Sequence, residues 1–189
     1  MEAYGSYGPK GLLATAPFLA YDSSLCNNVV QRKIAHVRVW GAQSMADGTT
    51  RGHYFEDLAV GMEARYVRRV LEQDVYAFAE LTGDTNPIHL DEIYAAATMF
   101  KGRIAHGTLT ASYISTILGT LLPGPGAIYI SQSLNFRGPV RIGDEVISTA
   151  RVLELLPARK RAILTCHCSV AGKTVLEGEA LMMVPSREA

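Results

Sequence analysis

The feature of this sequence that most restricts its fold is a long uncharged stretch in its middle. Between Arg103 and Arg137 there is no Asp, Glu, Lys or Arg, and the stretch contains an apolar run with helical character, residues 105–122. A surface helix needs a polar face, so a helix that is neutral all round is expected inside a core or a membrane. The many hydroxyl side chains of the run and the Pro and Gly residues at 123–126 argue against a membrane span. We therefore expect a helix enclosed by the protein's own sheet.

Segments with strand character surround this run. A first strand is predicted at 64–71, and after the uncharged helix apolar residues recur at every second position in most of the remaining segments, which is typical of half-buried antiparallel strands. These later segments are residues 128–136, 146–155, 162–170 and 175–184. Turn residues at 157–160 and 171–173 predict hairpins between neighbouring strands.

Between the first strand and the uncharged run the spacing of apolar residues becomes helical. A helix is predicted from Gln73 to Gly83, which tolerates the left-handed backbone that ends many helices. Asn86-Pro87 cannot continue a helix, because proline favours extended backbone in the residue before it. The segment from Asp84 to His89 is therefore expected to be a constrained turn, followed by a second helix over residues 91–98.

The composition favours an ordinary globular protein. The 189 residues include 18 basic and 18 acidic side chains, and 48% are apolar, which favours one domain and gives no basic stripe for nucleic acid. Residues 1–50 form an irregular leader that we expect to be poorly ordered, before a domain at 51–186. A cytoplasmic location is expected, or a mitochondrial matrix location if the leader is a presequence; no membrane partner is expected.

The three cysteines indicate neither disulfides nor a metal site. Cys26, Cys166 and Cys168 are few and odd in number, which suits a reducing compartment. In a strand the thiols of Cys166 and Cys168 share one face and His167 lies on the other, so this trio cannot chelate one ion. No metal is expected.

The predicted turn brings together residues that suit acid–base chemistry. Asp84 and His89 are five positions apart, and most such pairs are only solvated surface groups. Here, however, the turn is rigid, the two side chains can converge on one water, and Gly107 near the start of the apolar helix offers a backbone N–H to a ligand. An acid–base pair, an N–H donor for an oxyanion and an apolar wall are the parts of a catalytic site.

These residues lie in a pattern that resembles a known family. Residues 78–89, Phe-Ala-Glu-Leu-Thr-Gly-Asp-Thr-Asn-Pro-Ile-His, are similar to the signature of the (R)-specific enoyl-CoA hydratases, the hydratase-2 group of the MaoC-like dehydratases. The similarity extends over about residues 54–184, with further matching segments at 105–109, 126–129, 134–136 and 140–146. The leader has no counterpart in this family.

The resemblance implies an α+β hotdog fold, in which an antiparallel sheet wraps a long central helix, and a homodimer. It implies reversible addition of water to trans-2-enoyl-CoA, giving the (R)-3-hydroxyacyl-CoA, with short- to medium-chain substrates of fatty-acid or polyhydroxyalkanoate metabolism and no cofactor. Asp84 and His89 would activate the water, and the Gly107 N–H would bind the thioester oxygen. Asn86 and Ser115 correspond to positions that contact the substrate.

Purely structural interpretations of these residues are also possible. Ser115 can be a buried hydroxyl bonded to its own helix, Asn86 a turn former, and His106 a structural neighbour of Gly107. Thr108 departs from the larger apolar residue that relatives often carry, which leaves the chain-length preference open.

Other functions are also compatible with this sequence. A 3-hydroxyacyl-acyl-carrier-protein dehydratase performs the same chemistry on a different carrier, and a thioesterase shares the hotdog fold. A non-catalytic acyl-thioester-binding domain is the third alternative.

Overall fold

The computed structural model describes residues 39–40 and 51–188. The chain divides into a first unit, residues 1–36, which lies wholly outside the described residues, and a second unit, residues 37–189. The leader predicted for residues 1–50 therefore lies outside them too, apart from Val39–Trp40.

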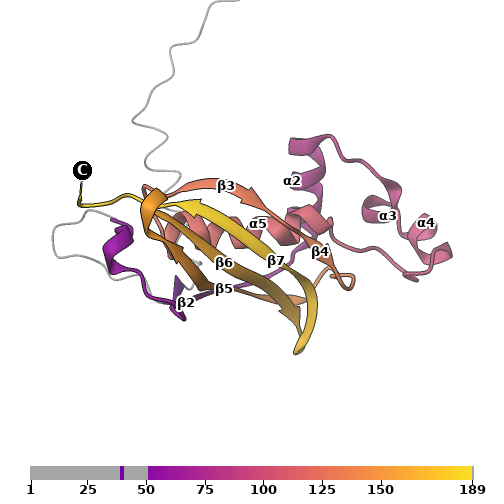
Figure 1. The fold of residues 1–189 in the computed structure, drawn as a ribbon. Coiled ribbons are helices and arrows are strands. Elements are labelled where there is room, and N and C mark those ends of the chain that lie inside the picture. The colour runs from indigo at the N-terminus through magenta and orange to yellow at the C-terminus, as the bar shows by residue number, and fades with distance from the viewer. Residues whose placement is uncertain (1–38, 41–50, 189) are drawn as a thin grey trace, which may run out of the picture. The chain divides into compact units, whose positions relative to one another are not determined.

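The second unit is built on one antiparallel sheet (Figure 1). Its strands are β1 (Val39–Trp40), β2 (Glu63–Arg69), β3 (Ile128–Gln132), β4 (Asn135–Phe136), β5 (Glu145–Leu156), β6 (Arg161–Val170) and β7 (Lys173–Met183). Their order across the sheet is β1-β2-β5-β6-β7-β3, and β4 also pairs with β7. The long strands β5, β6 and β7 are consecutive in the chain and adjacent in the sheet, so tight turns connect them.

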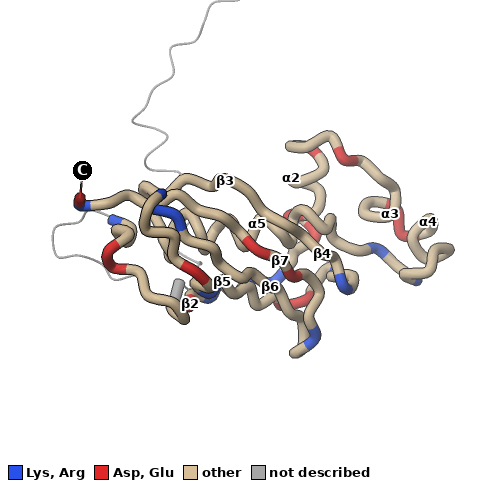
Figure 2. Tube along the Cα trace, viewed as in Figure 1, with Lys and Arg blue, Asp and Glu red and all other residues tan. Residues whose placement is uncertain are grey.

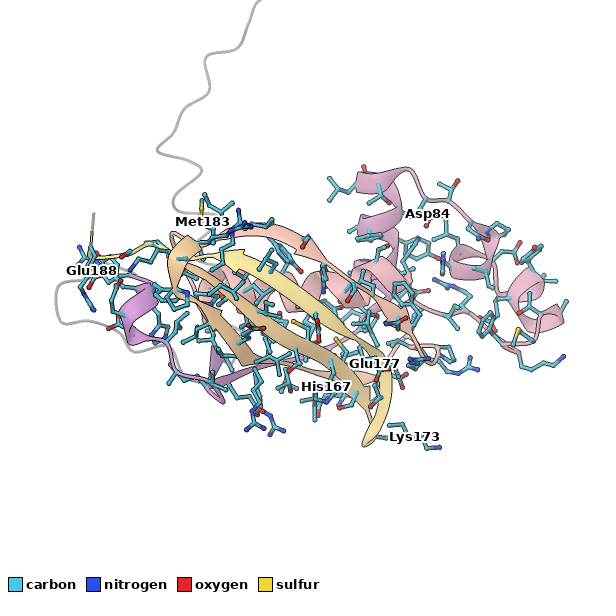
Figure 3. All side chains as sticks on the ribbon, in the orientation of Figure 1. Asp84, His167, Lys173, Glu177, Met183 and Glu188 are labelled. Carbon is cyan, nitrogen blue, oxygen red and sulfur yellow. The ribbon has the colours of Figure 1, made fainter. Side chains whose placement is uncertain are left out.

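The alternation predicted for β6 and for most of β7 is confirmed. Ala162, Leu164, Cys166 and Cys168 are buried on one face of β6, while the residues between them are partly exposed. On the other face His167 pairs in register with Glu177 of β7, and Figure 3 places both on neighbouring strands. The predicted hairpin at 171–173 and the turn at 157–160 are also present, the latter as the short 3-10 helix η3 (Pro157–Arg159).

The helices lie before and beside the sheet. A 3-10 turn, η2 (Phe55–Asp57), precedes β2, and the helices α2 (Glu72–Thr82), α3 (Pro87–Leu90) and α4 (Glu92–Ala97) follow it. The uncharged run forms α5 (Gly107–Thr120), which packs against β2, β5 and β6. Figure 1 shows α2, α3 and α4 together at one end of the sheet, near the start of α5.

The core lies between α5 and the concave face of the sheet. Its fully buried side chains come from both layers and include Ile114, Ile117, Leu118, Leu164, Leu176 and Met182. The apolar area that these residues remove from water is the main force that holds helix and sheet together. A curved antiparallel sheet around one long helix is the hotdog arrangement, so the α+β fold expected from the sequence is confirmed.

Two burial predictions are wrong. β3 was expected to be half-buried, but Ile128 and Ile130 are 54% and 40% exposed, because β3 is the last strand of the sheet and the core does not cover it. α5 was expected to be enclosed, yet Thr108, Ser112 and Ser115 are exposed on the side that the sheet leaves open. β3 and this side of α5 carry no charged residue, and Figure 2 shows β3 without red or blue.

The membrane interpretation of α5 finds no support. Over the part of the chain that the structure describes, every helix is too short or too polar to cross a bilayer.

Candidate active site

The turn between α2 and α3 is fixed by its own side chains. Gly83 ends α2 in the left-handed conformation, with φ of 77°, as its position predicted. The Asp84 carboxylate then accepts the backbone N–H of Asn86 (3.3 Å), and the Asn86 side-chain oxygen accepts the N–H of Ile88 (3.2 Å). Pro87 follows as the first residue of α3, where a missing N–H costs nothing. The turn is therefore rigid, and it leaves Asp84 exposed.

His89 lies inside α3, one helical turn after Asn86, rather than in the turn itself. Its side chain is 8% exposed, and its Nδ1 is 2.8 Å from the carbonyl oxygen of Ile104. A carbonyl only accepts, so Nδ1 carries the proton and Nε2 keeps a free lone pair. Burial lowers the pKa of His89 from its ordinary value, which favours the neutral ring. The ring can therefore accept a proton through Nε2 at neutral pH.

The backbone around His89 is held by a partly buried cation. Arg103 donates from Nε to the His89 carbonyl oxygen (2.8 Å) and forms an ion pair with Glu72 at the start of α2 (2.7 Å). Its guanidinium also lies over the ring of Tyr76, 5.2 Å from the centroid. Arg103 thus connects α2 and α3 and has little freedom to meet a distant ligand.

His106 is the site residue that the sequence interpretation placed least well. It is 1% exposed, its Nε2 is 3.0 Å from the carbonyl oxygen of Asp84, and its ring stacks on His89 with centroids 3.9 Å apart. The sequence offered one signal, its position directly before Gly107, but the contact with Asp84 spans 22 residues and no local pattern reveals it.

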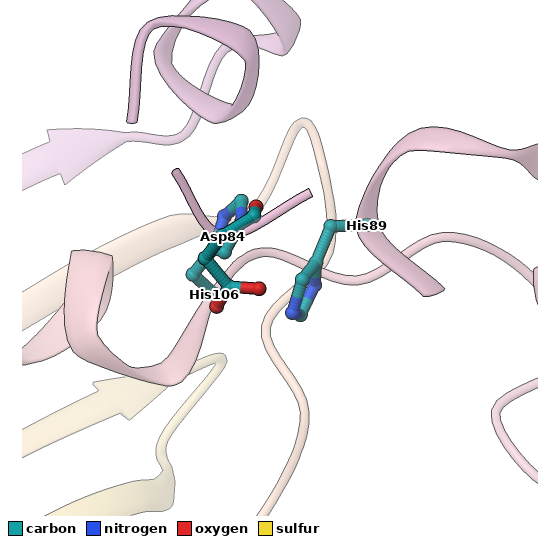
Figure 4. Close-up of side chains that lie close together, drawn as sticks. All are labelled: Asp84, His89 and His106. Atoms are coloured by element: carbon teal, nitrogen blue, oxygen red, sulfur yellow. The ribbon is translucent and has the colours of Figure 1, made fainter. Parts of the chain in front are cut away.

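Asp84, His89 and His106 lie together at this point (Figure 4). One candidate donor atom from each lies within 4.8 Å of the other two, which raises the question of a metal ion. The two imidazole planes are inclined at only 32° and stacked 3.9 Å apart. A metal ion bound to an imidazole nitrogen lies in the plane of that ring. Two planes oriented in this way intersect much farther from the ring nitrogens than the ~2.1 Å of a zinc–imidazole bond, so one ion cannot bind both rings. The arrangement suits proton transfer better than metal binding.

Gly107 begins α5 directly beside this group. It is exposed, and as the first residue of the helix its N–H has no acceptor within the helix. The ring of Phe136 packs against it, because a Cβ added to Gly107 would lie 2.7 Å from Cε1 of that ring. Only glycine therefore fits here without displacing Phe136.

A cavity of about 360 Å³ opens between the helices and β4. Its lining is mostly apolar, and His89 and Gly107 belong to it together with Met99, Phe100, Ile104, Ala105, Thr110, Phe136, Arg137, Gly138, Pro139, Val140, Val175 and Leu176. A concave apolar site with a few converging polar groups is typical of small-molecule binding.

The two remaining predicted site residues, Asn86 and Ser115, differ in their distance from the site. Asn86 caps α3 and braces the turn beside Asp84, in agreement with the plainer reading of its role. Ser115 is exposed on α5, two turns beyond Gly107, and does not line this cavity. The geometry thus places Asp84 beside His89 and His106, and His89 and Gly107 on the cavity wall, and it leaves Asp84 and Ser115 outside that wall.

Comparison with known proteins identifies relatives of this chain. The MaoC like domain family matches residues 57–166. A 3-hydroxybutyryl-CoA dehydratase of Methylorubrum extorquens is 58% identical over 71% of this chain and 86% of the relative. An (R)-specific enoyl-CoA hydratase of Rhodospirillum rubrum is 55% identical over 71% of this chain and 94% of the relative. The solved structure of an (R)-hydratase from Aeromonas caviae, involved in PHA biosynthesis, is 43% identical with a TM-score of 0.67, over 69% of this chain and 99% of that chain.

Proposed function

Because this chain belongs to the MaoC-like domain family, we propose that it is a hydro-lyase that adds water reversibly to trans-2-enoyl-CoA thioesters and gives (R)-3-hydroxyacyl-CoA. Its substrates are short- to medium-chain acyl thioesters of fatty-acid or polyhydroxyalkanoate metabolism. The observation that carries the proposal is an apolar cavity lined by His89 and Gly107, with a carboxylate oxygen of Asp84 within 4.8 Å of a ring nitrogen of His89.

The geometry supplies each part of a conjugate addition. Asp84 and the free Nε2 of His89 hold a water molecule, and one of them takes a proton from it as its oxygen bonds to C3 of the enoyl chain. The thioester oxygen gains negative charge as the enolate forms, and the exposed N–H of Gly107 stabilises that charge. The proton then returns to C2, which completes the addition of one water. The reverse sequence is dehydration.

The pair suits this task because its members differ in environment. Asp84 is exposed, and its side-chain oxygen accepts a backbone N–H. His89 is buried, with a lowered pKa and a fixed tautomer. An exposed carboxyl group and a base whose neutral form is favoured are therefore present together. Uncharged cavity walls such as Val140 and Leu176 suit the acyl chain.

The test is hydration of crotonyl-CoA and of a longer enoyl-CoA. The loss of the enoyl-thioester absorbance measures the rate, and chiral analysis identifies the product. Wild type is expected to give the (R)-alcohol, and Asp84→Asn and His89→Ala are expected to lose at least about 100-fold in kcat. Asp91→Asn removes a nearby carboxylate that only caps α4, and His167→Ala removes a histidine from the opposite face of the sheet. Both controls are expected to retain activity.

Other products would point elsewhere. Release of free coenzyme A without an alcohol would indicate a thioesterase. Hydration only when the acyl group is attached to a carrier protein would indicate the dehydratase of fatty-acid synthesis. Equal rates in wild type, Asp84→Asn and His89→Ala would contradict the assignment of the pair.

A second copy of the chain is the partner that fits the uncovered surfaces, and we propose a homodimer. β3 has one edge without a partner among the described strands, and Ile128, Tyr129 and Ile130 are exposed along it. Exposed apolar edge strands invite pairing with another strand. The open side of α5 is likewise uncharged, so a neighbouring chain can bury it without desolvating a charged group.

Sedimentation velocity tests the dimer with Ile130→Lys, which places a charge on the β3 edge. Wild type is expected to sediment as a dimer and Ile130→Lys as a monomer. Val60→Lys, at a 65% exposed apolar position in the turn before β2, is the matched control and is expected to remain dimeric. A monomeric wild type would contradict this proposal and leave the catalytic proposal intact.

A further inference from the structure

His106 contacts both members of the proposed acid–base pair and also begins the helix that carries the N–H donor. Its Nε2 lies 3.0 Å from the Asp84 carbonyl oxygen, and its ring stacks on that of His89 at 3.9 Å. It is the N-cap residue of α5, so its backbone leads directly into Gly107. No other described side chain has this combination of contacts.

The hydrogen bond to Asp84 defines which ring nitrogen carries the proton. The Asp84 carbonyl oxygen can only accept, so Nε2 of His106 must donate. Nδ1 is buried and has no hydrogen-bond partner within the described residues. The contacts of the ring therefore assign its donor proton to Nε2.

The stacking contact restrains the other member of the pair. Nδ1 of His89 is hydrogen-bonded to the Ile104 carbonyl oxygen. The ring can still rotate about that hydrogen bond, so its tilt depends on the side chains that pack against it. The His106 ring, at 32° to it, provides that packing, and Phe78 in turn packs against His106 with centroids 5.0 Å apart. The direction of the free Nε2 lone pair of His89 thus depends on His106.

We propose that His106 is a positioning residue that holds Asp84, His89 and the Gly107 N–H in the relative geometry needed for hydration. One rigid ring spans the turn after α2, the helix α3 and the start of α5. Displacement of a reacting group by about 1 Å costs on the order of 100-fold in rate, so a side chain that fixes three groups has a large effect on kcat. The inference rests on the hydratase function proposed above.

Substitutions separate the two contacts of the ring. His106→Gln places an amide N–H near the position of Nε2 and so retains the bond to Asp84, but it lacks the aromatic face. His106→Phe retains the stacking partner and lacks the donor. His106→Ala lacks both. Val152→Ala, at a 1% exposed core position of β5, is the control for loss of stability without any contact to the site.

The measurements are kcat and KM with crotonyl-CoA, each expressed per folded molecule from the unfolding curve of the same variant. We expect kcat to fall by about 100-fold in His106→Ala and by about tenfold in His106→Gln and His106→Phe, with KM within threefold of wild type. Val152→Ala is expected to unfold more easily but to keep its kcat. If His106→Ala does not fold, His106→Gln and His106→Phe carry the test.

The inference would be overturned by a kcat per folded molecule within threefold of wild type in the foldable variants, since a residue that only stabilises the core gives that result. Long-range ¹⁵N–¹H NMR of the wild type provides an independent check, because it distinguishes the Nε2–H from the Nδ1–H form. An Nδ1–H tautomer at His106 would overturn it as well. An inactive wild type would instead reject the hydratase function.

Discussion

Substitution of Gly107 by alanine tests whether the contact between α5 and Phe136 shapes the site. The added Cβ would lie 2.7 Å from Cε1 and 3.0 Å from Cδ1 of the Phe136 ring. Ordinary carbon–carbon contacts are about 3.5–4.0 Å, so the ring must retreat by roughly 1 Å. Phe136 is 53% exposed in the two-residue strand β4, so it can move without disturbing the core. The free energy of unfolding should therefore change by no more than about 1 kcal/mol.

Activity should respond much more strongly than stability. The ring forms part of the cavity wall beside Gly107, and a shift of that size beside the proposed oxyanion donor corresponds to roughly a 100-fold loss in kcat/KM for crotonyl-CoA. Gly119→Ala is the matched control, because it lies in the same helix and an added Cβ there meets nothing within 4 Å. It should leave kcat/KM unchanged.

A double-mutant cycle with Phe136→Ala assigns the loss to the ring. Without the ring the alanine at 107 has room, so Gly107→Ala should cost no more than about threefold in the Phe136→Ala background. The difference between the two backgrounds corresponds to a coupling free energy of about 2 kcal/mol, within the range for residues in contact. An equal loss in both backgrounds would refute the reasoning, and so would a Gly107→Ala enzyme with kcat/KM near that of wild type.

Three further predictions concern the base, its support and the sheet. The acid limb of the kcat/KM profile should lie below the ordinary histidine pKa of 6.5, because burial lowers the pKa of His89 and the neutral ring persists to lower pH; a limb above 6.5 would contradict this. Arg103→Ala should lower the free energy of unfolding in urea by about 1–3 kcal/mol, because it leaves the His89 carbonyl without its donor, whereas Arg65→Ala, whose ion pair is exposed, should change it by less than about 1 kcal/mol. Gly178→Ala should cost at least about 2 kcal/mol in the same assay, because its Cβ would lie 1.9 Å from the Ser133 carbonyl oxygen, while Gly138→Ala, with its nearest contact at 3.7 Å, should be mild.

Features decided by neighbours in the sequence could be predicted from it. The end of α2 at Gly83 follows from the need for a left-handed residue, and the buried face of β6 follows from its period of two. The turn that carries Asp84 could be predicted for the same reason, since Asn86 and Pro87 determine its backbone locally. The helical turn at His89 was missed, because Pro87 both interrupts one helix and begins another.

Features decided by contacts between distant segments could not be predicted in this way. His106 meets Asp84 across 22 residues and His89 meets Ile104 across 15, so no local spacing signals either bond. A single histidine before a glycine is compatible with many surroundings. The family resemblance indicated Asp84, His89 and Gly107, but not the positioning role proposed for His106.

The misjudged burial of α5 has a physical reason that bears on assembly. Absence of charge along a helix predicts that water is excluded from it, but not which surface excludes the water. The sheet covers the side of α5 that carries Ile114, Ile117 and Leu118, and it stops short of Thr108, Ser112 and Ser115. A side that always faced water would tolerate Lys or Glu at these positions, where they favour a helix more than Ser or Thr do. Small uncharged residues on that side, together with the uncharged exposed strand β3, are better explained by a second protein surface that covers both, which the proposed homodimer supplies.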